Sequence, residues 1–118
     1  MTPRLYHWAS CSTCRQAREE LAGSGRRVEL RDFFAEPLSS TELAGLAELA
    51  GGVRRIFSFN SPSFRKLGRT AESFADEELM ELIAAEPRFL RRPLLVNERA
   101  VVIGVAAIRA ADTPRDPG

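Results

Sequence analysis

Two cysteines, Cys11 and Cys14, are the residues whose type and spacing point most directly to chemistry. They are separated by Ser12 and Thr13, and no other cysteine is present to pair with either of them. A short apolar and aromatic segment precedes the pair, and apolar or small residues at helical spacing follow it. Because the first turns of a helix can bring two sulfurs within bonding distance, this spacing is typical of a redox-active dithiol.

The expected helix start favours Cys11 as the nucleophile. Free backbone N–H groups and the positive end of the helix macrodipole stabilise a thiolate there, and Arg15, one turn further on, would add a cation. Cys14 is then the resolving thiol. The N–H groups of Ser12–Cys14 would also bind a small oxyanion placed against the attacking sulfur. His7, at the end of the preceding strand, is placed either to assist deprotonation of Cys11 or to make one ordinary hydrogen bond.

Two other interpretations of the cysteines remain open. A structural zinc site usually takes four Cys or His ligands, whereas this chain offers only Cys11, Cys14 and His7, so we expect no metal. Free cysteines are also often simply buried and inert. The spacing and the helix start count against that second alternative.

Composition places the dithiol on one compact domain. A chain of 118 residues leaves no room for a second core. The net charge of +1 gives no strong field that would attract nucleic acid or an anionic membrane, so we expect neither as a direct partner. No apolar run approaches the roughly 20 residues that span a bilayer, and Met1–Trp8 lacks the features of a signal peptide. A cytoplasmic location is therefore expected.

Hydrophobic periodicity and turn residues predict an α/β layout, with helices packed on a small mixed sheet. The first elements expected are a strand over Arg4–Trp8, a helix from Ser12 that Gly23-Ser-Gly25 ends, and a half-exposed strand over Val28–Asp32. A helix from a Ser39–Glu42 capping box to about Ala50, two short helices across Asn60-Ser61-Pro62 and a helix capped by Asp76 and running to Ala85 follow. A hairpin of Leu94–Val96 and Val101–Ile103, a helix over Ala106–Ala111 and a mobile tail over Thr113–Gly118 complete the chain.

From about Leu5 to Arg109 the chain resembles the arsenate reductase and Spx family of thioredoxin-fold proteins. The matching segments are Leu5-Tyr6-His7, Cys11-Ser-Thr-Cys14-Arg15, Glu36-Pro37-Leu38-Ser39, Phe64-Arg65-Lys66-Leu67-Gly68 and Leu90-Arg91-Arg92-Pro93-Leu94. The resemblance implies a single thioredoxin-like domain over residues 1–112, with a helical insertion over about 39–85. It also implies a cis proline at Pro93 facing the cysteine loop.

For the arsenate reductases, the resemblance implies a catalytic Cys11, a His7 that lowers the pKa of that cysteine, and an oxyanion-binding Arg92. The residues expected around the substrate are Ser12, Thr13, Arg15, Arg92 and Pro93. These enzymes use two further arginines, at whose positions the chain has Ser58 and Gly104.

The first hypothesis is therefore a thiol-dependent oxidoreductase that reduces arsenate to arsenite. Cys11 attacks the arsenic and Cys14 resolves the intermediate as a disulfide. Thioredoxin, glutaredoxin or glutathione is expected as the external reductant, with no bound cofactor.

The alternative is a Spx-like regulator. The resemblance implies for this branch a redox-sensing transcription regulator that binds the C-terminal domain of the RNA polymerase alpha subunit, with Cys11 and Cys14 as a disulfide switch. Gly52 falls near a glycine used there at the polymerase interface, although it could equally be a generic glycine after a helix. This branch has no histidine at the position of His7.

Overall fold

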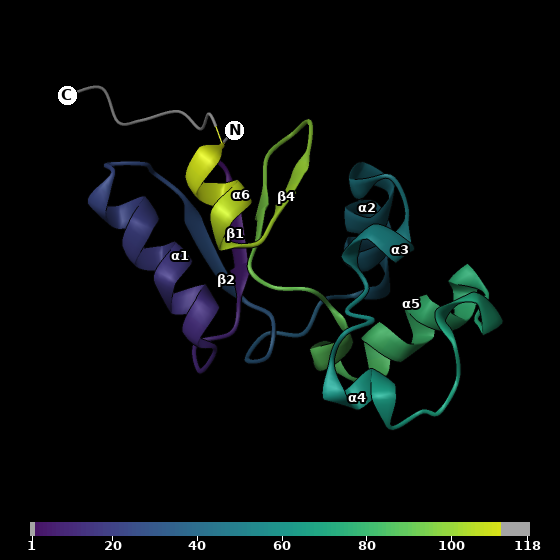
Figure 1. Ribbon diagram of the computed structural model, residues 1–118. Coiled ribbons are helices and arrows are strands. Elements are labelled where there is room, and N and C mark those ends of the chain that lie inside the picture. Colours follow the sequence, from purple (N-terminus) through teal and green to yellow (C-terminus); the bar gives the residue numbers. More distant parts are fainter. Residues whose placement is uncertain (1, 112–118) are drawn as a thin grey trace. The chain divides into compact units, whose positions relative to one another are not determined.

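The structure is a computed structural model that describes residues 2–111 of the chain (Figure 1). The described residues divide into two compact units, one containing the residues up to Glu36 and those from Arg92 onward, the other containing Pro37–Arg91. The expected helical insertion lies inside the second unit, and the expected mobile tail lies outside the described residues. Within the described part of the chain, no helix is both long and apolar enough to cross a membrane.

The first unit is built on a mixed four-stranded sheet with the strand order β2-β1-β3-β4. Its strands are β1 (Arg4–His7), β2 (Glu29–Asp32), β3 (Leu94–Val96) and β4 (Val101–Ile103). Strands β1 and β2 are parallel, whereas β1 with β3 and β3 with β4 are antiparallel. A parallel pair needs a crossover connection, which helix α1 (Ser12–Gly23) supplies. The predicted strand–helix–strand unit and C-terminal hairpin are therefore confirmed.

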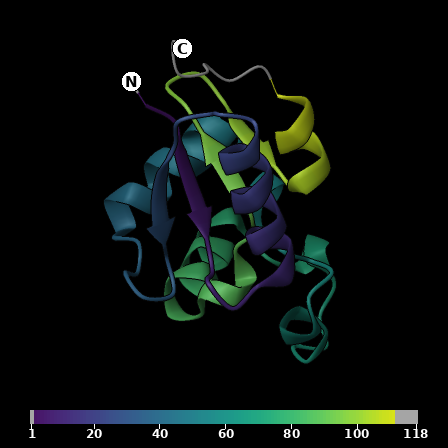
Figure 2. The ribbon, with the colours of Figure 1, turned by 90° about the vertical axis from the view of Figure 1, so that its left-hand side faces the viewer.

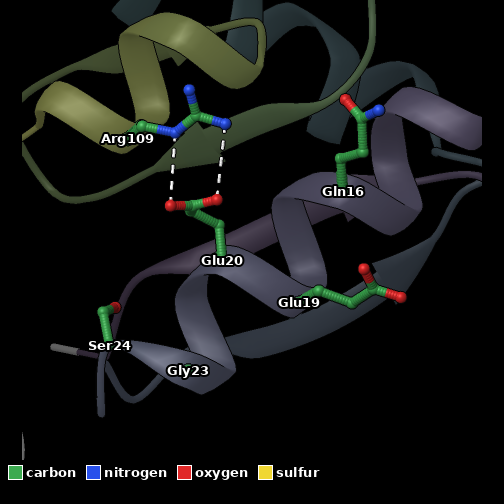
Figure 3. A pocket seen from close by; sticks show the side chains of 6 residues that line it. All are labelled: Gln16, Glu19, Glu20, Gly23, Ser24 and Arg109. Carbon is green, nitrogen blue, oxygen red and sulfur yellow. Dashed lines mark hydrogen bonds and ion pairs between the residues drawn. The ribbon is translucent and has the colours of Figure 1, made fainter.

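Helices α1 and α6 (Val105–Ala110) lie side by side over one face of this sheet (Figures 1 and 2). A buried apolar cluster joins them to the strands; its members are Leu5, Ala17, Leu21, Leu95 and Ile108. Arg109 of α6 and Glu20 of α1 also form a paired contact, Nε to Oε1 at 3.2 Å and Nη2 to Oε2 at 3.3 Å (Figure 3). This exposed ion pair contributes ~0.2–1 kcal/mol, whereas burying Ile108 alone contributes ~1.5–3 kcal/mol. The apolar cluster therefore dominates the attachment of α6.

Strand β2 is more exposed than the adjacent β1 because it forms one edge of the sheet. Val28, just before it, packs against the apolar cluster, but the side chain of Leu30 is 57% exposed. Both residues line an open hollow of about 510 Å³ that also contacts Ala22 of α1. The alternation in this segment predicts a half-exposed strand, and the structure shows that α1 leaves Leu30 uncovered.

The second unit is helical, as predicted. Its elements are α2 (Ser40–Ala50), α3 (Val53–Ile56), α4 (Pro62–Arg65), η1 (Ala71–Ser73), α5 (Asp76–Ala85) and η2 (Pro87–Phe89). A cluster of phenylalanines lies among them, with Phe57 stacked on Phe89 at 5.4 Å and edge-on to Phe64 at 5.6 Å. Buried aromatic side chains supply large apolar area, so they carry much of the packing of this unit.

The two predicted helix caps of this unit have different outcomes. The capping box of α2 is confirmed, since Ser39 Oγ accepts from the Glu42 N–H at 3.1 Å and Glu42 accepts from the Ser39 N–H at 3.0 Å. The prediction that Asp76 caps α5 is wrong, because the N-cap is Ala75 and Asp76 is already the first helical residue. Its carboxylate binds Arg54 at 3.0 Å instead, while Glu78 accepts from the Ala75 N–H.

Candidate functional site

The cysteines lie where strand β1 turns into helix α1. Cys11 is the N-cap residue with extended backbone, and its carbonyl accepts the first helical hydrogen bond, from the Arg15 N–H at 3.0 Å. The Cys11 N–H donates to the Trp8 carbonyl at 3.0 Å, which closes the turn that leads out of the strand. The dithiol therefore lies at a strand–helix junction, as predicted.

The sulfur of Cys11 is partly accessible and prone to ionise. It lies 3.1 Å from the hydroxyl oxygen of Thr13. Burial raises the pKa of Cys11, but hydrogen bonds from the Thr13 hydroxyl, from the Cys14 N–H and thiol and from the Thr13 N–H outweigh it and lower the pKa to about 7. Hydrogen bonds to a charged form stabilise that form, so about half of Cys11 is thiolate at neutral pH.

Cys14 has the opposite character. Its side chain is buried, and the Trp8 N–H donates to its sulfur at 3.4 Å. Burial raises the pKa of Cys14 to about 12; the Trp8 N–H and the positive charge of Arg92 oppose that rise, whereas the neighbouring Cys11 adds to it. Both thiols are free, and each is among the groups that shift the pKa of the other. The arrangement thus pairs an accessible thiolate with a buried, protonated thiol.

His7 is held by α1 rather than by the cysteine loop. Its ring is buried, and its Nδ1 lies 3.0 Å from Nη1 of Arg18. A guanidinium can only donate, so Nδ1 accepts and carries no proton. Burial and the charge of Arg18 lower the pKa of His7, while Asp32 opposes them. The observed partner of the His7 ring is therefore Arg18, in the second turn of α1.

The residues expected around an oxyanion are arranged as follows. Ser12, Thr13 and Arg15 lie at the exposed start of α1. The hydrogen bonds that lower the pKa of Cys11 come from Thr13 and Cys14. The Arg92–Pro93 peptide bond is cis, as expected.

Arg92 lies beside an aromatic pair that sequence reasoning did not identify. The rings of Trp8 and Phe34 stack with centroids 4.2 Å apart, and the guanidinium carbon of Arg92 lies 5.4 Å and 5.5 Å from the two centroids. These distances are within the range of cation–π attraction. The positive charge of Arg92 also lowers the pKa of Cys14, so this side chain acts electrostatically on the dithiol.

The other positions suggested by the resemblance are spread over the chain. Gly52 is the N-cap of α3 and Ser58 follows that helix, so both belong to the second unit. Gly104 is the N-cap of α6 in the first unit, with φ of 89°. Neither Ser58 nor Gly104 supplies a cation. In residues 2–111, no three His, Cys, Asp or Glu side chains are grouped in a way that would hold a metal ion.

Comparison with known proteins gives the family. A model of the ArsC family matches residues 6–110. The chain is 35% identical to the global transcriptional regulator Spx of Listeria innocua, over 85% of this chain and 77% of that protein. It is 31% identical to the regulatory protein MgsR of Bacillus subtilis, over 85% and 80% of the two chains.

The fold agrees with this assignment. The crystal structure of a possible arsenate reductase from Streptococcus mutans superposes with a TM-score of 0.71 at 28% identity, covering 87% of this chain and 90% of that one. The mixed sheet and the flanking helices are thus those of the thioredoxin-like α/β fold expected from the sequence. The chain belongs to the ArsC family.

Proposed function

We propose that this protein is a redox-sensing regulator similar to Spx, in which Cys11 and Cys14 form a disulfide switch. The observation that carries the proposal is the contrast between the two thiols, an accessible Cys11 with a pKa of about 7 beside a buried Cys14 with a pKa of about 12. The identity of about one third to Spx and MgsR supports the same assignment. The contact of His7 with Arg18 supports the regulator over the enzyme, because the enzyme hypothesis expects His7 to act on Cys11.

The switch needs only a peroxide as oxidant. The Cys11 thiolate attacks one peroxide oxygen, the O–O bond breaks, and a sulfenic acid forms with release of hydroxide or water. The sulfur of Cys14 then attacks the sulfur of Cys11, and the hydroxyl leaves as water with the thiol proton of Cys14. A disulfide results, which thioredoxin, glutaredoxin or glutathione reduces in the cytoplasm.

The proposed partner is the C-terminal domain of the RNA polymerase alpha subunit. Gly52, the position that the resemblance relates to that contact, has φ of 130° and open space around the place of a Cβ atom. A partner surface can approach the backbone closely at such a position.

Arsenate reduction is the second candidate, favoured by the low pKa of Cys11 and by Arg92 in the same unit. The thiolate would attack the arsenic of bound arsenate and displace one oxygen as water. Cys14 would then attack the Cys11 sulfur, and the electrons of the S–As bond would pass to arsenic, releasing arsenite. This candidate ranks second because an oxyanion held away from water needs paired charge, and Ser58 and Gly104 supply none.

Two assays run side by side test the assignment. A regulator binds the purified alpha-subunit domain in a way that depends on peroxide treatment, and Gly52→Arg abolishes binding. Gly52→Ala is the matched control, because it imposes the same backbone strain with little bulk. The second assay measures arsenate-dependent oxidation of NADPH, coupled to thioredoxin or glutaredoxin systems. Activity that is lost in Arg92→Ala would instead assign the protein to the reductases.

A further inference from the structure

The carboxylate of Asp32 joins two loops beside the dithiol. Asp32 is the last residue of β2. Its Oδ2 accepts from the Ala9 N–H at 3.2 Å, and its Oδ1 accepts from the N–H groups of Phe34 at 3.0 Å and Ala35 at 3.2 Å. Burial opposes ionisation, but these three backbone bonds hold the pKa of Asp32 below its usual value. The side chain is therefore an anionic acceptor for both loops at neutral pH.

The loop that Asp32 holds through Ala9 contains Trp8, which contacts both cysteines. The Trp8 carbonyl accepts from the Cys11 N–H, and the Trp8 N–H donates to the Cys14 sulfur. The Trp8 ring stacks on Phe34, whose own N–H is bound by Asp32. The Asp32 carboxylate thus restrains Phe34 directly and Trp8 through the adjacent Ala9. Trp8 is both the stacking partner of Phe34 and the residue whose N–H donates to Cys14.

We infer that Asp32 is a positioning residue for the resolving step, because it holds the Trp8 N–H on the sulfur of Cys14. The inference rests on the proposed dithiol chemistry but not on the identity of the oxidant or the partner. Cys14 must lose its proton to attack, and the Trp8 N–H stabilises the resulting thiolate. Cys11 relies on Thr13 and on the helix start instead. Loss of Asp32 should therefore slow resolution and spare the first attack.

An aromatic disulfide, dithiobis(nitrobenzoate), separates the two steps. The Cys11 thiolate attacks it, forms a mixed disulfide and releases one coloured nitrothiophenolate. The Cys14 thiolate then attacks the Cys11 sulfur, forms the internal disulfide and releases the second. The wild-type protein therefore gives two phases of colour, and Cys14→Ser gives only the first.

Asp32→Ala should slow the second phase about threefold to tenfold and leave the first unchanged. Loss of a hydrogen bond to a charged sulfur lowers the thiolate population about tenfold, and the higher intrinsic nucleophilicity of a more basic thiolate offsets part of that loss. Asp32→Asn should show a smaller slowing, since its amide oxygen can accept from only one of the two loops at a time. Glu29→Ala is the matched control, because it removes one negative charge from the same strand and has no contact with Ala9. The Glu29 carboxylate pairs with Arg4 at 3.1 Å.

The result also has an independent reporter. Trp8 is the only tryptophan in the chain, so its fluorescence reports on the stack with Phe34. It should change in Asp32→Ala and stay constant in Glu29→Ala. If Asp32→Ala does not fold, the slower second phase of Asp32→Asn carries the same test.

Three outcomes would overturn the inference. The first is a second phase in a folded Asp32 variant that is as fast as in the wild-type protein. The next is equal slowing of both phases, which indicates a general loss of structure. The third is absence of a second phase in the wild-type protein, which would also remove the dithiol switch. Failure to bind the alpha subunit would refute the regulator alone and leave the two-phase result intact.

Discussion

Replacing Thr13 by Val should raise the pKa of Cys11 and make the nucleophile less reactive at neutral pH. The Thr13 hydroxyl lies 3.1 Å from the Cys11 sulfur and is the largest of the contributions that lower its pKa. Valine has the same shape without the hydroxyl, so the substitution removes the donor and preserves the volume. Thr13 is exposed at the start of α1, where no buried packing would be lost.

The size of the change follows from the strength of one hydrogen bond. A hydrogen bond to a charged group contributes roughly 1.5–3 kcal/mol, and the partly exposed Cys11 sulfur favours the lower end of that range. One pKa unit corresponds to about 1.36 kcal/mol, so the pKa should rise by about 1 unit. Starting from a pKa of about 7, the thiolate fraction at pH 7 falls from about one half to about one tenth.

The rate of alkylation of Cys11 by iodoacetamide, measured against pH in a Cys14→Ser background, gives the pKa directly. Because the thiolate is the reactive form, the rate rises with pH and its midpoint equals the pKa. The background substitution is needed since two coupled thiols share macroscopic pKa values. At pH 7 the Thr13→Val variant should react about fivefold more slowly, whereas Thr13→Ser, which keeps the hydroxyl, should retain the midpoint near 7.

An unchanged midpoint in Thr13→Val would refute this reasoning. It would mean that the helix N-terminus and the backbone N–H groups alone stabilise the thiolate. An equal shift in Thr13→Ser would also contradict it, because the hydroxyl would then not be the group responsible.

Three further predictions follow from the same structure. Peroxide should join Cys11 to Cys14 within one chain, so mass spectrometry should find the monomer lighter by two hydrogens, and mainly intermolecular dimers would contradict the dithiol. His7→Ala should leave the alkylation midpoint of Cys11 unmoved and lower the free energy of unfolding by about 1–3 kcal/mol in urea, because it removes a buried acceptor; a raised midpoint would restore His7 to the site. Ser39→Ala should cost about 1 kcal/mol in the same unfolding assay through loss of the α2 cap, and Ser39→Asp should retain most of it.

The sequence determined the features whose physical causes lie within a few residues. Ser39 and Glu42 specify the start of α2 because each side chain accepts from the backbone N–H of the other residue. The dithiol at the start of α1 is encoded in the same local way, by an apolar strand, a spacing that matches a helix turn, and free N–H groups beyond Cys11. The strand and hairpin positions follow from alternation and from turn residues.

The chemical environment of each side chain depended on residues far away in the sequence. Local spacing placed His7 near Cys11, but Arg18 of α1 binds its ring, and burial together with the charge of Arg18 lowers its pKa. No sequence pattern indicated that partner, because the contact arises only when the helix packs on the sheet. Leu30 is exposed for a related reason, since its position at a sheet edge is set by the strand order rather than by its own alternation.

Asp32 shows most clearly what only the tertiary structure decided. Its bonds to Phe34 and Ala35 are local and belong to a turn that sequence reasoning can anticipate. Its bond to Ala9 spans 23 residues. It exists because β1 and β2 are parallel, so that both strands finish at the same end of the sheet. Because of that pairing, Asp32 also binds the loop that contains Trp8. The N–H of Trp8 in turn donates to the buried sulfur of Cys14.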